Sequence, residues 1–117
     1  MSLQLCRLSD LPVQGSKGFD LPQTRLFVVR DYSGVYVYLN RCPHLGIPLQ
    51  WRADRFLDND GHYILCSNHG ALFEKNTGLC LQGPCRGESL WQIENRIENG
   101  FVIIEEDELP ALPAVPQ

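Results

Sequence analysis

Short apolar and β-branched runs, separated by turn residues, recur along the whole chain. Each run is roughly four to eight residues long, which is the length of a strand and too short for an ordinary helix. The runs predict strands at residues 3–8, 25–30, 35–40, 63–66, 71–74, 90–93 and 101–105. Gly and Asn supply the positive φ of tight hairpins at residues 31–34, 59–61, 76–78 and 99–100. The pattern predicts an antiparallel all-β domain without a helix or an internal repeat.

Two of these runs are apolar at every position: Val-Tyr-Val-Tyr-Leu at 35–39 and Phe-Val-Ile-Ile at 101–104. A strand with one face in water alternates apolar and polar residues, whereas a strand covered on both faces does not. We therefore expect both segments in the core of a sandwich or barrel.

The size and charge of the chain exclude several classes of function. Its 117 residues fit one domain. A net charge of −4 gives no reason for binding nucleic acid or an anionic membrane, since both require clustered Lys and Arg. No apolar run approaches the roughly 20 residues of a membrane helix, and the first residues do not resemble a secretory signal. We expect a soluble cytoplasmic protein, with a domain over residues 1–107 and a mobile Pro-rich tail over residues 108–117.

Two short boxes combine Cys and His in a pattern typical of metal ligands. The first is Cys42-x-His44 and the second is Cys66-x-x-His69. Each box follows a predicted strand and is closed by a glycine one or two residues later, so both should form loops at strand ends. Two thiolates and two imidazoles are the ligand set of a [2Fe–2S] cluster that has Cys on one iron and His on the other. They could also form a structural Cys₂His₂ zinc site, although zinc motifs usually separate paired ligands by two or more residues.

The two boxes resemble the binding boxes of the Rieske family. The resemblance continues beyond them through Phe73, Thr77-Gly78 and Gly83-Pro84-Cys85 to Leu90. It implies an antiparallel β-sandwich with a small cluster-binding subdomain, whose loops lie at about residues 41–47, 66–71 and 82–86. It also implies one [2Fe–2S] cluster per chain. By position in the motif, Cys42 and Cys66 would bind the inner iron, and His44 and His69 would bind the outer iron at the edge where electrons leave.

Departures from other branches of the family indicate the subtype. Ile47 and Asn68 stand where Rieske proteins of quinol-oxidising complexes have a pair of disulfide-bonded cysteines. Ala71 and Phe73 stand where those proteins place Ser and Tyr hydroxyls near the cluster sulfurs, where donors raise the potential. The chain therefore resembles the low-potential soluble branch, which includes ferredoxins of ring-hydroxylating oxygenases.

This resemblance implies a one-electron carrier between a reductase and an oxygenase or similar enzyme, with no substrate chemistry of its own. Two alternatives remain open from the sequence. The chain could be the Rieske subunit of a larger oxidoreductase such as nitrite reductase, or a zinc-stabilised interaction module. The segment 51–60 between the boxes could be an inserted loop that docks a partner.

The remaining conspicuous residues have simpler interpretations. Buried packing is the expected role of Cys6, Cys80 and Cys85, because Cys outside disulfides is often buried. His62 is expected to face solvent in a turn. We expect Trp51 and Trp91 to anchor the core or a loop rather than relay electrons.

Overall fold

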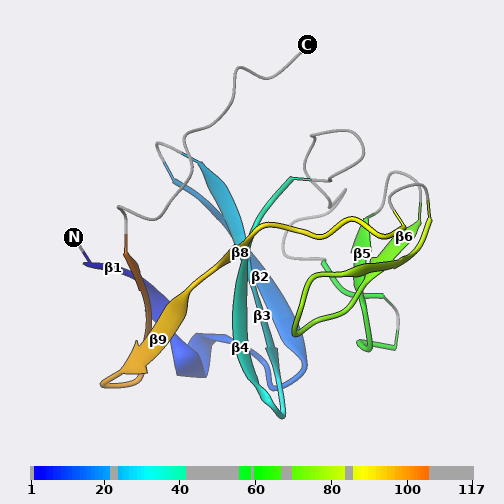
Figure 1. Cartoon of the computed structure of the whole chain (residues 1–117). Coiled ribbons are helices and arrows are strands. Elements are labelled where there is room, and N and C mark those ends of the chain that lie inside the picture. Colours follow the sequence, from blue (N-terminus) through cyan, green and yellow to red (C-terminus); the bar gives the residue numbers. More distant parts are fainter. Residues whose placement is uncertain are drawn as a thin grey trace.

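The computed structural model describes residues 2–21, 24–41, 56–58, 60–66, 70–83 and 86–105. Antiparallel strands and one short 3-10 helix make up the regular structure of these residues (Figure 1). In chain order they are β1 (Ser2–Arg7), η1 (Leu8–Asp10), β2 (Gly15–Asp20), β3 (Arg25–Asp31), β4 (Gly34–Leu39), β5 (Ile64–Cys66), β6 (Ala71–Phe73), β7 (Cys80–Gln82), β8 (Gln92–Ile93), β9 (Asn95–Glu98) and β10 (Phe101–Glu105). The predicted all-β antiparallel fold is confirmed. No helix in the described ranges is long and apolar enough to span a membrane.

The strands form three sheets, which lie side by side in Figure 1. Sheet A has the order β1-β10-β9, sheet B the order β2-β3-β4-β8, and sheet C the order β5-β6-β7. Sheet B is the middle layer, with sheet A to its left and sheet C to its right in this view. Sheet C follows the first predicted box in the chain and contains the start of the second.

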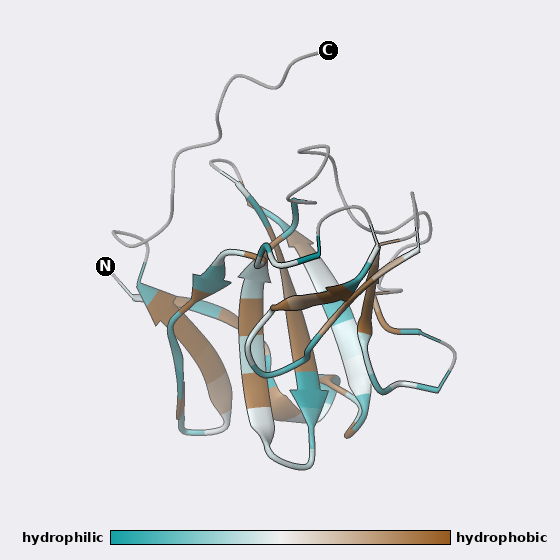
Figure 2. Ribbon diagram, turned by 45° about the vertical axis from the view of Figure 1, so that its right-hand side comes forward, coloured by the Kyte–Doolittle hydropathy of each residue, from teal (hydrophilic) through white to brown (hydrophobic). Residues whose placement is uncertain are grey.

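Sheet B is covered on both faces, which explains the continuous apolar runs. Along β3, Leu26 and Val28 face sheet A, whereas Phe27 and Val29 face sheet C, because successive side chains point to opposite sides of a strand. The A–B core consists of Leu11, Leu26, Val28, Val37, Leu39, Ile93, Val102 and Ile104. The B–C core consists of Phe27, Val29, Tyr38, Phe56, Ile64, Cys66, Ala71, Phe73, Cys80 and Leu90. Figure 2 shows hydrophobic residues gathered in the strands, whereas most of the connecting turns are hydrophilic or intermediate.

The hairpin between β9 and β10 shows why the turn residues were informative. Asn99 and Gly100 both have positive φ, of 51° and 81°, and Glu98 pairs directly with Phe101. This is the two-residue turn that Asn-Gly favours, since the positive φ matches the twist of the paired strands. The predicted turn at 99–100 is confirmed.

Three strands were not predicted: β2, β7 and β9. Each is the last strand at one edge of its sheet. An edge strand is solvated more than a central one, so its sequence need not be apolar, and β9 reads Asn-Arg-Ile-Glu. Pairing with the neighbouring strand, rather than the hydrophobic pattern, makes these segments extended. The predicted tail at 108–117 lies outside the described residues.

Candidate metal centre

Of the four predicted ligands, the structure describes Cys66. It is the last residue of β5 and is fully buried. Cys42, His44 and His69 lie outside the described residues, as do Ile47 and Asn68. Within the described ranges, no group of three or more His, Cys, Asp or Glu side chains lies close enough together to bind a metal ion.

The hairpin of β5 and β6 fixes Cys66, the first residue of the second box, and Gly70. Cys66 pairs with Ala71 across the hairpin, and the Gly70 N–H donates to the Cys66 carbonyl at 2.9 Å. Gly70 has a φ of 70°, in the left-handed region that glycine adopts without strain. A ligand such as Cys66, held by a paired backbone, can keep a defined position.

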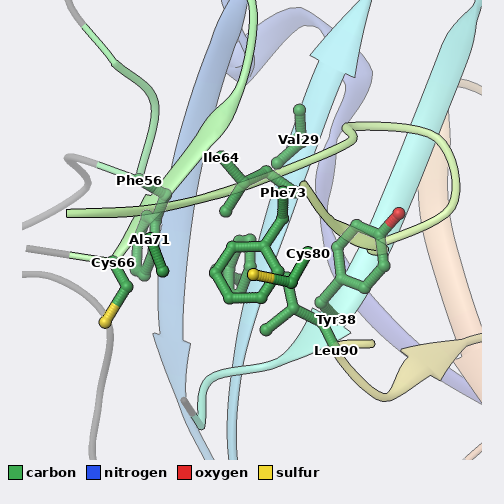
Figure 3. Packing of buried hydrophobic residues seen from close by; sticks show 10 residues of the cluster. Val29, Tyr38, Phe56, Ile64, Cys66, Ala71, Phe73, Cys80 and Leu90 are labelled. Carbon is green, nitrogen blue, oxygen red and sulfur yellow. The ribbon is translucent and has the colours of Figure 1, made fainter. Parts of the chain in front are cut away.

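The two buried thiols of the B–C core point in different directions (Figure 3). The Cys80 sulfur lies among the side chains of the core, and it donates to the Gln82 carbonyl at 3.4 Å. The Cys66 sulfur lies at the margin of the cluster and points away from Phe73 and Cys80. This arrangement fits a packing role for Cys80, whereas the Cys66 thiol is directed away from the centre of the B–C core. A thiolate donor there suits an iron–sulfur ligand set.

Gly83, at the start of the third predicted loop, passes close to Ala71, the pairing partner of Cys66. A Cβ placed on Gly83 would lie 2.8 Å from the Ala71 Cα and 2.9 Å from its Cβ, which is closer than real Cβ atoms approach. Gly83 also has a positive φ of 111°. Glycine at 83 and a small residue at 71 are therefore both needed for this contact. Residues 84 and 85 lie outside the described ranges.

Aromatic stacking joins the site-bearing sheet to sheet B. The Phe27 and Phe56 rings are parallel within 4°, with centroids 4.4 Å apart, and Tyr38 lies 5.6 Å from Phe27. The Phe56 N–H donates to the Ser16 hydroxyl at 3.2 Å, and the Phe56 carbonyl accepts from Leu65 N–H at 2.8 Å. Phe56 therefore links β2 and β3 to the strand that ends at Cys66.

Contacts among Tyr38, Lys75 and Asp31, here called the polar latch, hold the end of sheet C at the β6–β7 turn. The Tyr38 hydroxyl donates to the Lys75 carbonyl at 2.7 Å. The Lys75 ammonium donates to the Gly61 carbonyl at 2.8 Å and lies 3.7 Å from the Asp31 carboxylate. Burial raises the pKa of Tyr38, because desolvation disfavours the phenolate, so the hydroxyl keeps the proton that it donates. The β6–β7 turn is thereby fixed to the β3–β4 turn.

The comparisons with known proteins agree with this arrangement. The family model described as Rieske [2Fe-2S] domain matches residues 2–112. The chain belongs to the Rieske [2Fe-2S] domain family. Membership implies a [2Fe–2S] cluster, because that group defines the family.

One curated relative of this Rieske domain is the cytochrome b6-f complex iron-sulfur subunit of Chlorobaculum thiosulfatiphilum. It is 31% identical over 102 residues, which are 87% of this chain and 52% of the relative. The chain thus spans about half the length of that relative.

Solved structures of ferredoxins are also similar. The Sphingomonas yanoikuyae B1 ferredoxin has a TM-score of 0.72 and 25% identity, covering 91% of this chain and 99% of that one. A second similar structure is a complex of reduced oxygenase and oxidised ferredoxin in carbazole 1,9a-dioxygenase. Its TM-score is 0.71 at 25% identity, over 88% of this chain and 91% of that chain. The all-β architecture of the Rieske domain here is that of Rieske-type ferredoxins.

Sequence reasoning missed the latch of this Rieske domain. Lys75 is far from Tyr38 and Asp31 in the sequence, and each of the three looks like an ordinary surface or strand residue. One signal was available: Tyr38 lies in a wholly apolar run, and a buried phenol hydroxyl needs a hydrogen-bond partner.

The other sequence predictions have mixed outcomes. His62 is exposed, as predicted, and its backbone N–H donates to the Asp58 carboxylate at 2.9 Å. Cys6 is half-buried against the A–B core, and its pKa is raised by that burial and by the charge of Asp10. The predicted anchoring role of Trp91 is wrong, because its side chain is 59% exposed. Its backbone carbonyl holds the segment instead, accepting from Leu39 N–H at 2.9 Å. Trp51 and Cys85 lie outside the described residues.

Proposed function

We propose that this chain is a one-electron carrier that takes electrons from a reductase and delivers them to an oxygenase or similar enzyme. The observation that carries the proposal is the pair of Cys/His boxes on a Rieske domain that aligns with 99% of a ferredoxin. When bound, the [2Fe–2S] group supplies a one-electron redox couple. The chain itself performs no substrate chemistry in this proposal.

The proposed ligands of a single cluster are Cys42, His44, Cys66 and His69. The position of Cys66 supports the assignment, because it is the last residue of β5 and its thiol points away from Phe73 and Cys80. The thiolates would bind one iron and the imidazoles the other, in the arrangement of Rieske centres. Exposed imidazoles would then form the edge at which electrons are exchanged.

Two buried residues beside the second box support a low potential. Ala71 pairs with Cys66, and Phe73 lies deeper in the B–C core. Neither side chain carries a hydrogen-bond donor. Donors to cluster sulfurs favour the reduced, more negative state, so a site without these hydroxyls should have a lower potential.

The proposed acceptor is an oxygenase, because a similar solved structure is a complex of an oxygenase with its ferredoxin. The net charge of −4 suits a partner whose docking surface is basic. The proposal places the chain in the cytoplasm as a soluble protein, without nucleic acid or membrane partners.

Replacement of single histidines tests the ligand assignment. We expect His44→Ala and His69→Ala each to abolish the normal visible absorption and circular dichroism of the cluster, because an imidazole ligand is lost. The matched control is His62→Ala, which removes an exposed turn histidine and should leave the spectrum unchanged. An unaltered spectrum in His69→Ala would refute the ligand set.

A second candidate function is permanent membership of a larger oxidoreductase. It is favoured by the relative that is a subunit of the cytochrome b6-f complex. Purification under native conditions distinguishes the two functions. A carrier is isolated alone and is reversibly reduced by a separate reductase, whereas a subunit is recovered in a tight stoichiometric complex. The zinc-stabilised module would instead yield a colourless protein that contains zinc and no acid-labile sulfide.

A further inference from the structure

A pocket of about 680 Å³ is lined by residues of η1, the end of β3 and the β9–β10 turn. The η1 residues Leu8 and Ser9 and the turn residues Asn99 and Gly100 form two of its walls. Arg30 lines it at the end of β3 that is next to the β3–β4 turn. Asn40 lies at the opposite end of the β3–β4 pair, where its N–H donates to the Arg25 carbonyl at 2.8 Å.

Two arginines give this pocket a concentrated positive charge. The Arg30 guanidinium is held by two bonds from Nη1, to the Leu8 carbonyl at 3.1 Å and the Leu11 carbonyl at 2.9 Å. The Arg7 guanidinium lies over the Phe101 ring, 5.6 Å from its centroid. Both groups are thus positioned by neutral partners, which leave their charge uncompensated.

The acidic groups nearby do not neutralise the two guanidinium groups. None of the described lining residues is an Asp or Glu. Asp10 accepts a bond from the backbone N–H of Arg7, and the Glu98 carboxylate binds Arg96. In the part of the chain that the structure describes, neither Arg7 nor Arg30 forms an ion pair.

We propose that this pocket binds a small organic oxyanion, a carboxylate or phosphate ester, separately from the cluster. The guanidinium groups of Arg7 and Arg30 would bind the oxyanion, because a planar fork of N–H donors matches carboxylate and phosphate oxygens. The Phe101 ring and Leu8 offer an apolar wall for the body of the ligand, and Ser9 and Asn99 offer polar groups at the rim. The volume lies within the range of small-molecule sites, roughly 300–1,000 Å³.

Such a ligand would join two segments that already touch. The Leu8 N–H donates to the Gly100 carbonyl at 2.7 Å, so η1 and the β9–β10 turn share one backbone bond. An oxyanion between Arg7 and Arg30 would add contacts across the same junction. Because it binds the folded state, it would raise the midpoint of thermal unfolding in a concentration-dependent way.

Nuclear magnetic resonance of the ¹⁵N-labelled holoprotein tests the site. Phenyl phosphate and benzoate serve as probes, with sodium chloride at equal ionic strength as the reference. We expect saturable shifts of the Ser9, Asn99 and Gly100 amides and of the Arg7 Nε–H. Saturation by either probe supports the oxyanion site, and the probe that binds more tightly identifies the ligand as a phosphate ester or a carboxylate. The visible spectrum should not change, which separates this result from the proposed function.

Charge-removing variants decide whether the binding is specific. Arg7→Gln should weaken binding by about tenfold or more, the usual effect of losing a charge-assisted hydrogen bond. The matched control, Arg25→Gln, removes an exposed arginine near Asp20 outside the pocket and should leave the affinity unchanged. Ser9→Ala is the second pocket variant, in case Arg7→Gln does not fold, and it should weaken binding by a smaller factor. Equal losses in Arg7→Gln and Arg25→Gln, or shifts that remain linear to about 10 mM probe, would overturn the proposal.

Discussion

Sheet B separates two cores that differ in composition. The A–B core is aliphatic, built from Leu, Ile and Val side chains. The B–C core contains Phe27, Phe56, Phe73 and Tyr38 together with two buried thiols. Aliphatic side chains fill space without a preferred orientation, whereas stacked rings constrain the angle between the elements that carry them. On the side of sheet B that faces sheet C, the packing therefore constrains the geometry more strongly than on the other side.

The sheets on the two sides also differ in length. Strands β1 and β10 of sheet A have six and five residues, whereas β5, β6 and β7 have three residues each. A short ladder contributes few hydrogen bonds, so sheet C depends more on packing against Phe27 and on the bond from Tyr38 to Lys75. The geometry of the second box is thus set by contacts with sheet B as much as by its own hairpin.

Substitutions of neighbouring residues on β3 compare the two cores directly. They should have the largest effect on the free energy of unfolding. Phe27→Ala should reduce the free energy of unfolding by about 3–5 kcal/mol and Leu26→Ala by about 2–5 kcal/mol, because each empties a fully buried position. Only Phe27→Ala should also alter the visible circular dichroism of the cluster. Urea unfolding and cluster spectra measure the two effects. An equal spectral change in Leu26→Ala would mean that the two cores do not differ in their influence on the site.

Substitutions at Gly83 and Gly87 test whether a close backbone contact beside the second box affects the cluster. Gly83→Ala should cost about 1–3 kcal/mol and disturb the cluster spectrum, because the new Cβ would collide with Ala71. Gly87→Ala is the matched control: Gly87 also has a positive φ, of 91°, but nothing lies within 4 Å of its added Cβ. Gly87→Ala should lower the free energy of unfolding through backbone strain but leave the cluster spectrum unchanged. If both variants alter the spectrum alike, the close approach of Gly83 to Ala71 does not determine the geometry of the cluster site.

Removing a charge from the polar latch should have the smallest effect on the free energy of unfolding, and this effect should depend on pH. Partial burial alone would raise the pKa of Asp31, but hydrogen bonds from Ser33 and Gly34 and the charge of Lys75 outweigh it and lower the pKa. A lowered pKa means that Asp31 stabilises the fold above its unfolded pKa of about 4, and that this contribution is lost as pH falls through the folded value. Asp31→Asn should therefore be less stable than the wild type at pH 6, by under about 1 kcal/mol, and the difference should shrink near pH 3. Urea unfolding at both pH values measures this, and a difference independent of pH would contradict the assignment.

The central strands could be predicted from the sequence because both of their faces are buried. Residues 35–39 and 101–104 are continuously apolar, and they correspond to β4 and β10. Edge strands such as β2, which contains two glycines and a lysine, carry no such pattern. Their extended form depends on pairing with a neighbour, which a local pattern does not encode.

At the candidate site, too, local features could be predicted from the sequence, whereas contacts between segments could not. The motif predicted that Cys66 lies at a strand end, and the structure confirms this position. The latch of Tyr38, Lys75 and Asp31 joins segments far apart in the sequence, and the contact of Gly83 with Ala71 depends on the pairing of β6 with β7, so neither could be predicted. The exposure of Trp91 was also unexpected, since a large aromatic side chain is usually buried for most of its surface.

Low-temperature electron paramagnetic resonance of the dithionite-reduced protein tests the central claim most directly. A [2Fe–2S] cluster with His ligands on one iron should give a rhombic signal with a low average g value, accompanied by iron and acid-labile sulfide. Absence of a signal in a protein that contains zinc would contradict the proposed ligand set and the electron-carrier function together.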